Sequence, residues 1–305
     1  MFRRVCAARR LRGFACWAGL FAIVAAGRVR GELIIPEVAQ SVVVDFSSFA
    51  GDGLSPFPSP GQLDSATWRV GGFTDGTLDY GGTGVAGDFA RGKSSGGVTA
   101  GGLYAFQVAS ADAALGVQAT GTDFNPGFFE LRIRNMTGAA IADWDVGFDL
   151  YCRNDQGRST AWDFSYSTDG LTFTDLPSLA FRSPTTANST VFERTSFSTV
   201  IPVSVADENQ FYLRWTSADV GGSGSRDEFA LDNVSITATA TPEPGTLVLT
   251  GLAAIGLVGH RWRRRCREGQ TRVPQALDSV GRFNTVGRCG GVSPTCGPIN
   301  SGPRT

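Results

Sequence analysis

The chain has 305 residues, and its formal net charge at pH 7 is −1. That balance conceals a strongly acidic middle, because residues 32–240 hold 25 Asp and Glu against 11 Lys and Arg, a net charge of about −14. Such a region lacks the basic surface that nucleic-acid binding requires, so nucleic acid is excluded as a partner.

The single histidine of the chain, His260, lies beyond this acidic region. Without a histidine, residues 32–240 cannot form a Ser–His–Asp or Cys–His catalytic arrangement or a histidine-ligated zinc or copper site. Paired carboxylates are the one catalytic option left. However, solvated acidic residues are common on the exposed face of a strand and do not by themselves indicate a catalytic pair. We therefore predict that the protein is not an enzyme.

Residues 1–31 predict a secretory signal peptide. Five arginines lie before or at the start of an apolar stretch, Phe14–Ala26, and small residues suitable for cleavage occur at 24–26 and 29–31. A basic start, a short apolar stretch and a small-residue cleavage site define such peptides. Arg9-Arg10 leaves the twin-arginine route open, although the general export route is our preferred interpretation.

Residues 32–240 contain one cysteine, Cys152, so this region holds no internal disulfide. A domain of this size has a core large enough to be stable without one. We expect Cys152 to be a small buried residue, with a free reactive thiol as the alternative.

Residues 51–102 are rich in glycine, with four Gly-Gly pairs. They also contain Trp68, Phe73, Tyr80 and Phe89, which a flexible linker would lack. This segment therefore predicts strands joined by long loops within the same domain.

Five segments of the acidic region alternate apolar and polar residues with a period of two. No long helical period of apolar residues occurs between residues 41 and 240. Strict alternation predicts strands with one buried face and one solvated face. Asp169-Gly170 predicts a β-hairpin over residues 162–174. The fold we predict is all-β, a β-sandwich of jelly-roll type, with a partly open barrel as the alternative. The alternating segments are residues 128–134, 144–150, 162–167, 211–215 and 229–236.

A glycine-rich acidic segment spans residues 219–233. Calcium takes six to eight oxygen ligands from flexible loops, so this segment predicts a possible calcium site, although its spacing is not that of an EF-hand. The alternative is a surface hairpin with solvated acids and a contact through Arg226. The possible ligands are Asp219, Asp227, Glu228 and Asp232.

Sugar binding is a second possibility for the acidic region, because lectin-like sandwiches stack exposed aromatic side chains on sugar rings. Trp144, Trp162 and Trp215 fall in the apolar phase of alternating strands, which predicts that they are buried. Trp68, beside the glycine-rich segment, is the best candidate for an exposed, sugar-stacking tryptophan.

Residues 241–267 contain three parts in a fixed order. Pro242-Glu243-Pro244 is followed by an apolar stretch and then by a basic cluster. Prolines end preceding structure, and an apolar run followed by arginines predicts a membrane helix, residues 246–260, whose arginines lie in the cytoplasm. The cluster comprises Arg261, Arg263, Arg264 and Arg265.

This order resembles the PEP-CTERM sorting signal of bacterial surface proteins. The resemblance implies recognition by exosortase, a membrane protease, and release or membrane anchoring at the cell surface. The exported region is similar to β-sandwich modules found alongside such signals, which implies fold and location but no chemistry. The residues behind this second resemblance are 88–92, 164–170, 212–215 and 227–234.

Residues 268–305 are rich in Gly, Pro and Arg with little periodicity, and we expect a disordered tail. Taken together, the sequence predicts an exported, surface-sorted, non-catalytic protein of the cell envelope or exopolysaccharide matrix, with a structural or adhesive role. A carbohydrate-binding module is the alternative, and a carboxylate-dependent glycoside hydrolase is the second alternative. No cofactor other than calcium is suggested.

Overall fold

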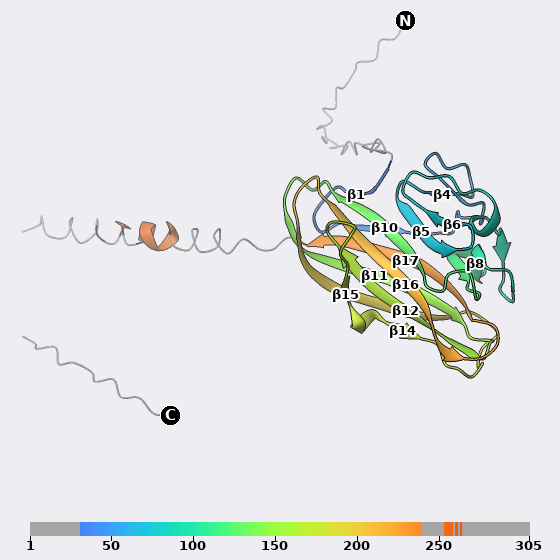
Figure 1. The fold of residues 1–305 in the computed structure, drawn as a ribbon. Coiled ribbons are helices and arrows are strands. Elements are labelled where there is room, and N and C mark those ends of the chain that lie inside the picture. Colours follow the sequence, from blue (N-terminus) through green and yellow to red (C-terminus); the bar gives the residue numbers. More distant parts are fainter. Residues whose placement is uncertain (1–30, 240–252, 259, 262, 264–305) are drawn as a thin grey trace, which may run out of the picture. The chain divides into compact units, whose positions relative to one another are not determined.

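The structure is a computed structural model, and it describes residues 31–239, 253–258, 260–261 and 263. The chain divides into two compact units, Met1–Pro242 and Glu243–Thr305, and each is described by itself. The described part of the first unit is a two-layer sandwich of β-sheets (Figure 1). The all-β prediction is therefore confirmed.

Eight strands within residues 31–239 form one sheet, which we call sheet A. They are β1 (Leu33–Ile35), β5 (Trp68–Phe73), β6 (Gly76–Leu78), β10 (Gly127–Asn135), β12 (Arg158–Ser167), β13 (Thr174–Asp175), β14 (Phe181–Arg182) and β16 (Gln210–Gly222).

Seven strands in the same range form the facing sheet, sheet B. They are β2 (Ser41–Val44), β7 (Lys93–Ser94), β8 (Gly102–Ala109), β9 (Asp112–Gln118), β11 (Ile141–Arg153), β15 (Glu193–Val205) and β17 (Glu228–Thr239). The glycine-rich segment adds the short pair β3 (Leu54–Ser55) and β4 (Leu63–Asp64) and the 3-10 helix η1 (Gly87–Phe89), and a second 3-10 helix, η2, spans Pro177–Leu179.

The strand order is β13-β12-β16-β10-β5-β6 in sheet A and β15-β11-β17-β9-β8-β7 in sheet B. From β9 onward the long strands alternate between the two sheets: β10, β12 and β16 belong to sheet A, and β9, β11, β15 and β17 belong to sheet B. Each connection from one long strand to the next after β9 therefore carries the chain across the sandwich, and these connections gather at its two ends.

Aromatic side chains from the two sheets meet in the core. The Phe148 ring of β11 lies 5.5 Å from Trp215 of β16 and 5.3 Å from Phe164 of β12. Trp162 of β12 meets Phe229 of β17 at 5.3 Å. These residues occupy the apolar phase of the predicted alternation, and each is almost completely buried, so the predicted phase of these strands is confirmed.

The alternation in β17 contains an interruption. Phe229 and Leu231 are buried in the core, and so are Val234 and Ile236, which lie in the opposite phase. The extra residue is accommodated by a shift of register in the pairing with β11, and Asn233 takes a positive φ of 49°. Asn is one of the few residues other than Gly that tolerate this conformation, so it suits a β-bulge.

The predicted hairpin is also observed, because β12 pairs with β13 through Ser165–Asp175 and Tyr166–Thr174. Its loop is organised by the exposed carboxylate of Asp169, which accepts hydrogen bonds from the N–H groups of Thr172 and Leu171 at 2.8 Å each. These bonds stabilise the charged form and lower the pKa of Asp169 to about 2.

Cys152 is buried at the end of β11, as expected of a small core residue. Burial raises the pKa of its thiol, so the reactive thiolate is disfavoured.

The described residues of the second unit, 253–258, 260–261 and 263, are helical. Arg261 and Arg263 belong to this helix. No described helix has the length and apolar character needed to cross a membrane. The predicted signal peptide (apart from Gly31), Pro242-Glu243-Pro244, Arg264, Arg265 and the 268–305 tail lie outside the described residues.

Among the described residues, the buried core of the sandwich lies within residues 35–238, so the fragment 31–240 contains its own core and is expected to fold alone. We predict that Trp215→Ala lowers the free energy of unfolding of this fragment by about 3–5 kcal/mol, because it leaves a cavity between the sheets. Urea unfolding measures the change. The control is Leu171→Ala, which alters a side chain that is 87% exposed and should change stability by less than about 0.5 kcal/mol. Equal effects of the two substitutions would contradict this description of the core.

Candidate functional site

Trp68 does not present its ring to solvent, and the prediction of an exposed tryptophan at this position is wrong. Its side chain is 3% exposed and packs 5.4 Å from Phe46 and 6.1 Å from Trp215. The physical reason is that Trp68 begins β5, which pairs with the central strand β10 and shares its inward face. Glycine-rich flanks do not prevent such burial.

The four possible calcium ligands do not converge on one site. Asp219 is paired with Arg158 and Arg226, and Glu228 is paired with Arg153. Asp227 accepts a hydrogen bond from the N–H of Gln156, and Asp232 accepts one from the N–H of Asn233. Among the residues that the structure describes, no group of three or more acidic, histidine or cysteine side chains is placed to hold a metal ion.

A cleft of about 490 Å³ opens at one end of the sandwich, and this volume lies within the usual range of small-molecule sites. Four connections form it. The β7–β8 loop supplies Gly97–Thr99, the end of β9 supplies Gln118–Gly121, the β11–β12 turn supplies Asp155 and Gln156, and the β16–β17 turn supplies Gly224–Arg226.

Glu228 fixes the β7–β8 loop, which forms the first wall of the cleft. This carboxylate is 1% exposed and accepts hydrogen bonds from the N–H groups of Gly97 at 2.9 Å and Val98 at 2.6 Å. Gly96, with φ of 92°, has to be glycine, because a Cβ there would lie 2.8 Å from both the Glu228 carboxylate and the Arg153 side chain. The loop is therefore fixed in place before any ligand arrives.

An aromatic cluster on the outer face of sheet B supports the same loop. Tyr104 stacks on Phe106 with ring centroids 5.2 Å apart, and Phe106 contacts Phe192 at 5.0 Å. Val98 packs against this cluster. This packing holds the loop at a second point besides Glu228.

Gln118 joins the end of β9, which forms the second wall of the cleft, to the β16–β17 turn, which forms the fourth. Its side-chain amide donates to the carbonyl oxygens of Ala119 at 2.8 Å and Arg226 at 3.1 Å. Arg226 in turn donates to Asp219 of β16 at 2.9 Å. This chain of contacts ties the β16–β17 turn to the end of β9.

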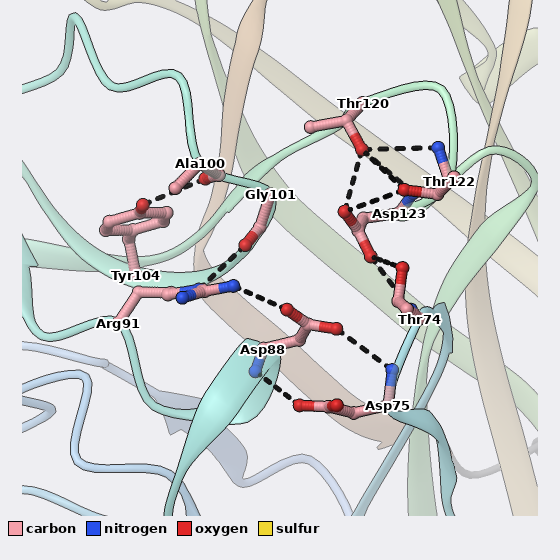
Figure 2. Close-up of polar contacts among 10 residues, drawn as sticks. All are labelled: Thr74, Asp75, Asp88, Arg91, Ala100, Gly101, Tyr104, Thr120, Thr122 and Asp123. Carbon is pink, nitrogen blue, oxygen red and sulfur yellow. Dashed lines mark hydrogen bonds and ion pairs between the residues drawn. The ribbon is translucent and has the colours of Figure 1, made fainter.

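Figure 2 shows how a buried carboxylate orders the segment that carries Thr120. Asp123 accepts hydrogen bonds from the Thr74 N–H at 2.8 Å, from the Thr74 hydroxyl at 2.7 Å and from the Thr120 hydroxyl at 2.7 Å. Burial by itself would raise the pKa of Asp123, but these hydrogen bonds outweigh it and the pKa is lowered. The glycine-rich segment is thereby connected to the rim of the cleft.

A second network in Figure 2 anchors the chain just beyond the first wall. Arg91 donates to the Gly101 carbonyl at 2.8 Å and to the Asp88 carboxylate at 2.6 Å. The Asp88 carboxylate accepts a hydrogen bond from the Asp75 N–H at 2.9 Å, and the Asp75 carboxylate accepts one from the Asp88 N–H at 2.8 Å. These contacts hold the segment between η1 and β8 in a single arrangement.

The third wall is Asp155 and Gln156. Asp155 is paired with Arg153 at 2.8 Å and accepts a hydrogen bond from the Gln156 side-chain amide at 2.8 Å. Arg153 also binds Glu228 at 3.0 Å, so one guanidinium contacts both carboxylates. The walls of the cleft therefore offer hydroxyl, amide and backbone groups, whereas each charged group nearby already has a partner of opposite charge.

Asp227 lies in the protein interior next to this end of the sandwich, with an exposed fraction of 0%. Burial raises the pKa of its carboxyl from 3.8 to about 6, and hydrogen bonds from Ser183 and Gln156 oppose the shift only in part. Its side chain does not line the cleft.

The sequence patterns did not predict this cleft, although they predicted long loops within residues 51–102. The lining residues come from four segments that are widely separated in the chain. No local pattern marks Gln118 or Thr120, since their role depends on which loops meet at the end of the sandwich.

No protein-family model matches the chain, and no curated protein matches it. Three solved structures illustrate the matches at the level of structure. The first is the CBM22-1 and GH10 modules of xylanase 10B from Clostridium thermocellum, complexed with xylohexaose, with 12% identity and a TM-score of 0.32. The match covers 66% of this chain and 29% of that chain, so this protein spans less than a third of the length of that chain.

The second is the K3 cleaved adhesin domain of Lys-gingipain from Porphyromonas gingivalis, with 13% identity, a TM-score of 0.32, and coverage of 64% of this chain and 98% of that chain. The third is CBM27-1 of Caldicellulosiruptor saccharolyticus, complexed with mannohexaose, with 11% identity, a TM-score of 0.33, and coverage of 66% and 99%. Similarity at this level does not assign this protein to a family or an activity.

We predict that Asp227→Asn makes the fragment 31–240 less sensitive to rising pH. Because the folded-state pKa of about 6 exceeds the usual 3.8, the folded protein binds this proton more tightly than the unfolded chain. Stability therefore falls as pH rises from about 4 through 6. Relative to the unaltered protein, the variant should gain on the order of 2 kcal/mol between pH 4 and pH 7, measured by urea unfolding.

Asp169→Asn provides a control of opposite sign, since the pKa of Asp169 is lowered to about 2. Its carboxylate stabilises the fold above the unfolded-state pKa, and that stabilisation is lost as pH falls toward 2. This variant should therefore lose stability at pH 7 relative to pH 2. An equal effect of Asp227→Asn at pH 4 and pH 7 would contradict a buried Asp227 with a raised pKa.

Proposed function

We propose that residues 31–239 form a non-catalytic glycan-binding domain and that the cleft at the end of the sandwich receives the sugar. The observation that carries this proposal is a polar cleft with fixed walls in which the charged groups are already paired. An uncharged ligand rich in hydroxyl groups suits such a surface, because each hydroxyl both donates and accepts hydrogen bonds. The proposal favours a carbohydrate-binding module over a purely structural role.

Binding without hydrolysis is the form of this proposal that the carboxylates support. A glycosidase needs two carboxyl groups that flank the sugar, one of them with a raised pKa. Asp155 and Glu228 both pair with Arg153, and Asp227, whose pKa is raised, lies outside the lining of the cleft. We therefore do not assign the domain to the glycoside hydrolases.

The domain would act outside the cell. The N-terminal signal peptide and the PEP-CTERM-like signal would deliver it, with exosortase as the processing partner and an extracellular polysaccharide as the ligand. An adhesive role in the envelope or matrix would then follow from sugar binding. For the fold itself, the alternation of consecutive long strands between two sheets supports a jelly roll.

We predict that Ser225→Trp abolishes glycan binding by filling the mouth of the cleft. Ser225 is exposed and lines the cleft, so a larger side chain there obstructs a ligand without entering the core. A glycan array first identifies an oligosaccharide that the fragment 31–240 binds, and calorimetry then compares the proteins. Affinity should fall at least tenfold, a loss of about 1.4 kcal/mol or more.

Ser223→Trp is the matched control, because Ser223 is exposed on the same turn but does not line the cleft. This variant should bind as the unaltered domain does. Failure to bind any neutral or acidic glycan at millimolar concentration would refute the proposed function. The release of new reducing ends from a bound oligosaccharide would refute its non-catalytic form.

Sorting has a separate test. We predict that protein recovered from the surface of the producing bacterium lacks residues 1–31 and ends before the arginines at 261–265, because both signals are cleaved during delivery. Intact-mass spectrometry of the recovered protein measures both ends. A cytoplasmic protein that retains residues 1–305 would be incompatible with sorting.

A further inference from the structure

Strand β15 forms one edge of sheet B (Figure 1), and within the described residues it pairs with β11 alone. It is 13 residues long, Glu193–Val205, whereas the other strands of sheets A and B that pair on one side only in the described range have two to four residues, namely β1, β2, β6, β7, β13 and β14. A long edge strand presents a row of unpaired backbone N–H and C=O groups to solvent. The outer edge of β15 is therefore the longest open edge in the part of the chain that the structure describes.

The sequence of β15 leaves this edge unprotected over seven residues. Glu193 and Arg194 stand at one end, and Pro202 stands near the other. Between them, Thr195–Ile201 reads TSFSTVI, without charge, proline or glycine. Natural edge strands are commonly protected by charged side chains, prolines or bulges, and short uncharged segments of β-branched and aromatic residues favour strand pairing.

Burial along β15 also indicates a missing neighbour. Phe197 stacks on Phe148 with ring centroids 5.2 Å apart, yet Phe197 remains partly exposed whereas Phe148 is almost completely buried. On the opposite face of the strand, Ser198 is exposed and Val200 is 55% exposed. An additional strand beside β15 would cover Phe197 and satisfy the open backbone groups.

We propose that β15 pairs antiparallel with β15 of a second copy of this chain, which would join two copies of sheet B edge to edge. A two-fold symmetric contact uses the same surface on both molecules. The segment 195–201 carries no charge that would attract a charged partner, and an identical segment supplies the matching uncharged, β-branched surface. A second copy is thus the partner whose chemistry the strand itself specifies.

Charge sets the conditions under which this dimer forms. Each domain carries about −14 within residues 32–240, so two copies repel one another. Salt screens this repulsion, with a Debye length of about 30 Å at 0.01 M and about 10 Å at 0.1 M. Strand pairing itself is not ionic, so the dimer should become tighter as salt is added.

The test is sedimentation velocity on the fragment 31–240 over a concentration series, at low and at high sodium chloride. The unaltered fragment should show a monomer–dimer equilibrium with a dissociation constant that falls as salt rises. The double variant S198K/V200K places two charges on the open edge and should weaken dimerisation at least tenfold. A fragment that stays monomeric at millimolar concentration in high salt would overturn the proposal.

The chain offers a closely matched control. Ser41 and Val43 of β2 repeat the Ser-x-Val spacing of Ser198 and Val200, and both are exposed, Val43 at 54%. The variant S41K/V43K therefore makes the same substitutions and the same change of charge on another strand. It should dimerise at least as well as the unaltered fragment, since each copy is less negative. Equal loss of dimer in both variants would overturn the assignment to β15.

A second measurement keeps the proposal testable if S198K/V200K fails to fold, which circular dichroism would reveal. Ser198→Cys provides an exposed site for a spin label, and the native Cys152 is buried. Paired strands lie about 4.8 Å apart, so labels near the strand centre should be within about 20 Å of each other in the dimer. A dimer with labels farther apart than about 30 Å, or a monomer that instead pairs with an unrelated extended peptide, would refute self-pairing.

Discussion

A shortage of positive charge constrains the whole domain. Residues 31–239 contain ten arginines and one lysine, and each of those ten arginines is in an ion pair. Several of these pairs lie where a carboxylate is removed from water. Glu130 and Glu228 are each 1% exposed, and a buried carboxylate without its partner would cost several kcal/mol. The arginines beside Glu130 and Glu228 prevent this penalty, whereas the buried Asp227 pairs with none of the described arginines and its pKa is raised instead.

The same constraint gives the cleft its chemical character. Arg153 is shared between Asp155 and Glu228, and Arg226 is bound to Asp219. Each of these carboxylates already contacts an arginine, so a charged ligand would have to displace an existing partner. A neutral, hydroxyl-rich ligand meets no such competition, which is why the proposed ligand is a sugar.

Residue patterns predicted the strands better than they predicted the site. Alternation identifies which side of a strand faces the core, and Trp144, Trp162 and Trp215 are buried as their phase requires. The bulge at Asn233 was not foreseen, because a single extra residue reverses the phase without any warning in composition. Trp68 was misjudged because its burial follows from pairing with β10, a contact between segments some sixty residues apart in sequence. The cleft was missed for the same reason, since strand order decides which loops meet.

The cleft and the β15 edge have a common consequence if both proposals hold. In one cleft, each neutral hydrogen bond to the ligand replaces hydrogen bonds to water, so it contributes only roughly 1 kcal/mol to the free energy of binding. A dimer through β15 would carry two such clefts, and two linked sites can exceed the affinity of one by a factor of about 10²–10⁴ without any new contact. That gain applies only to a ligand that presents many identical sugars, as a polysaccharide does. The acidic surface would keep the copies apart at low salt, so ionic strength would control how firmly the protein holds a polymeric ligand.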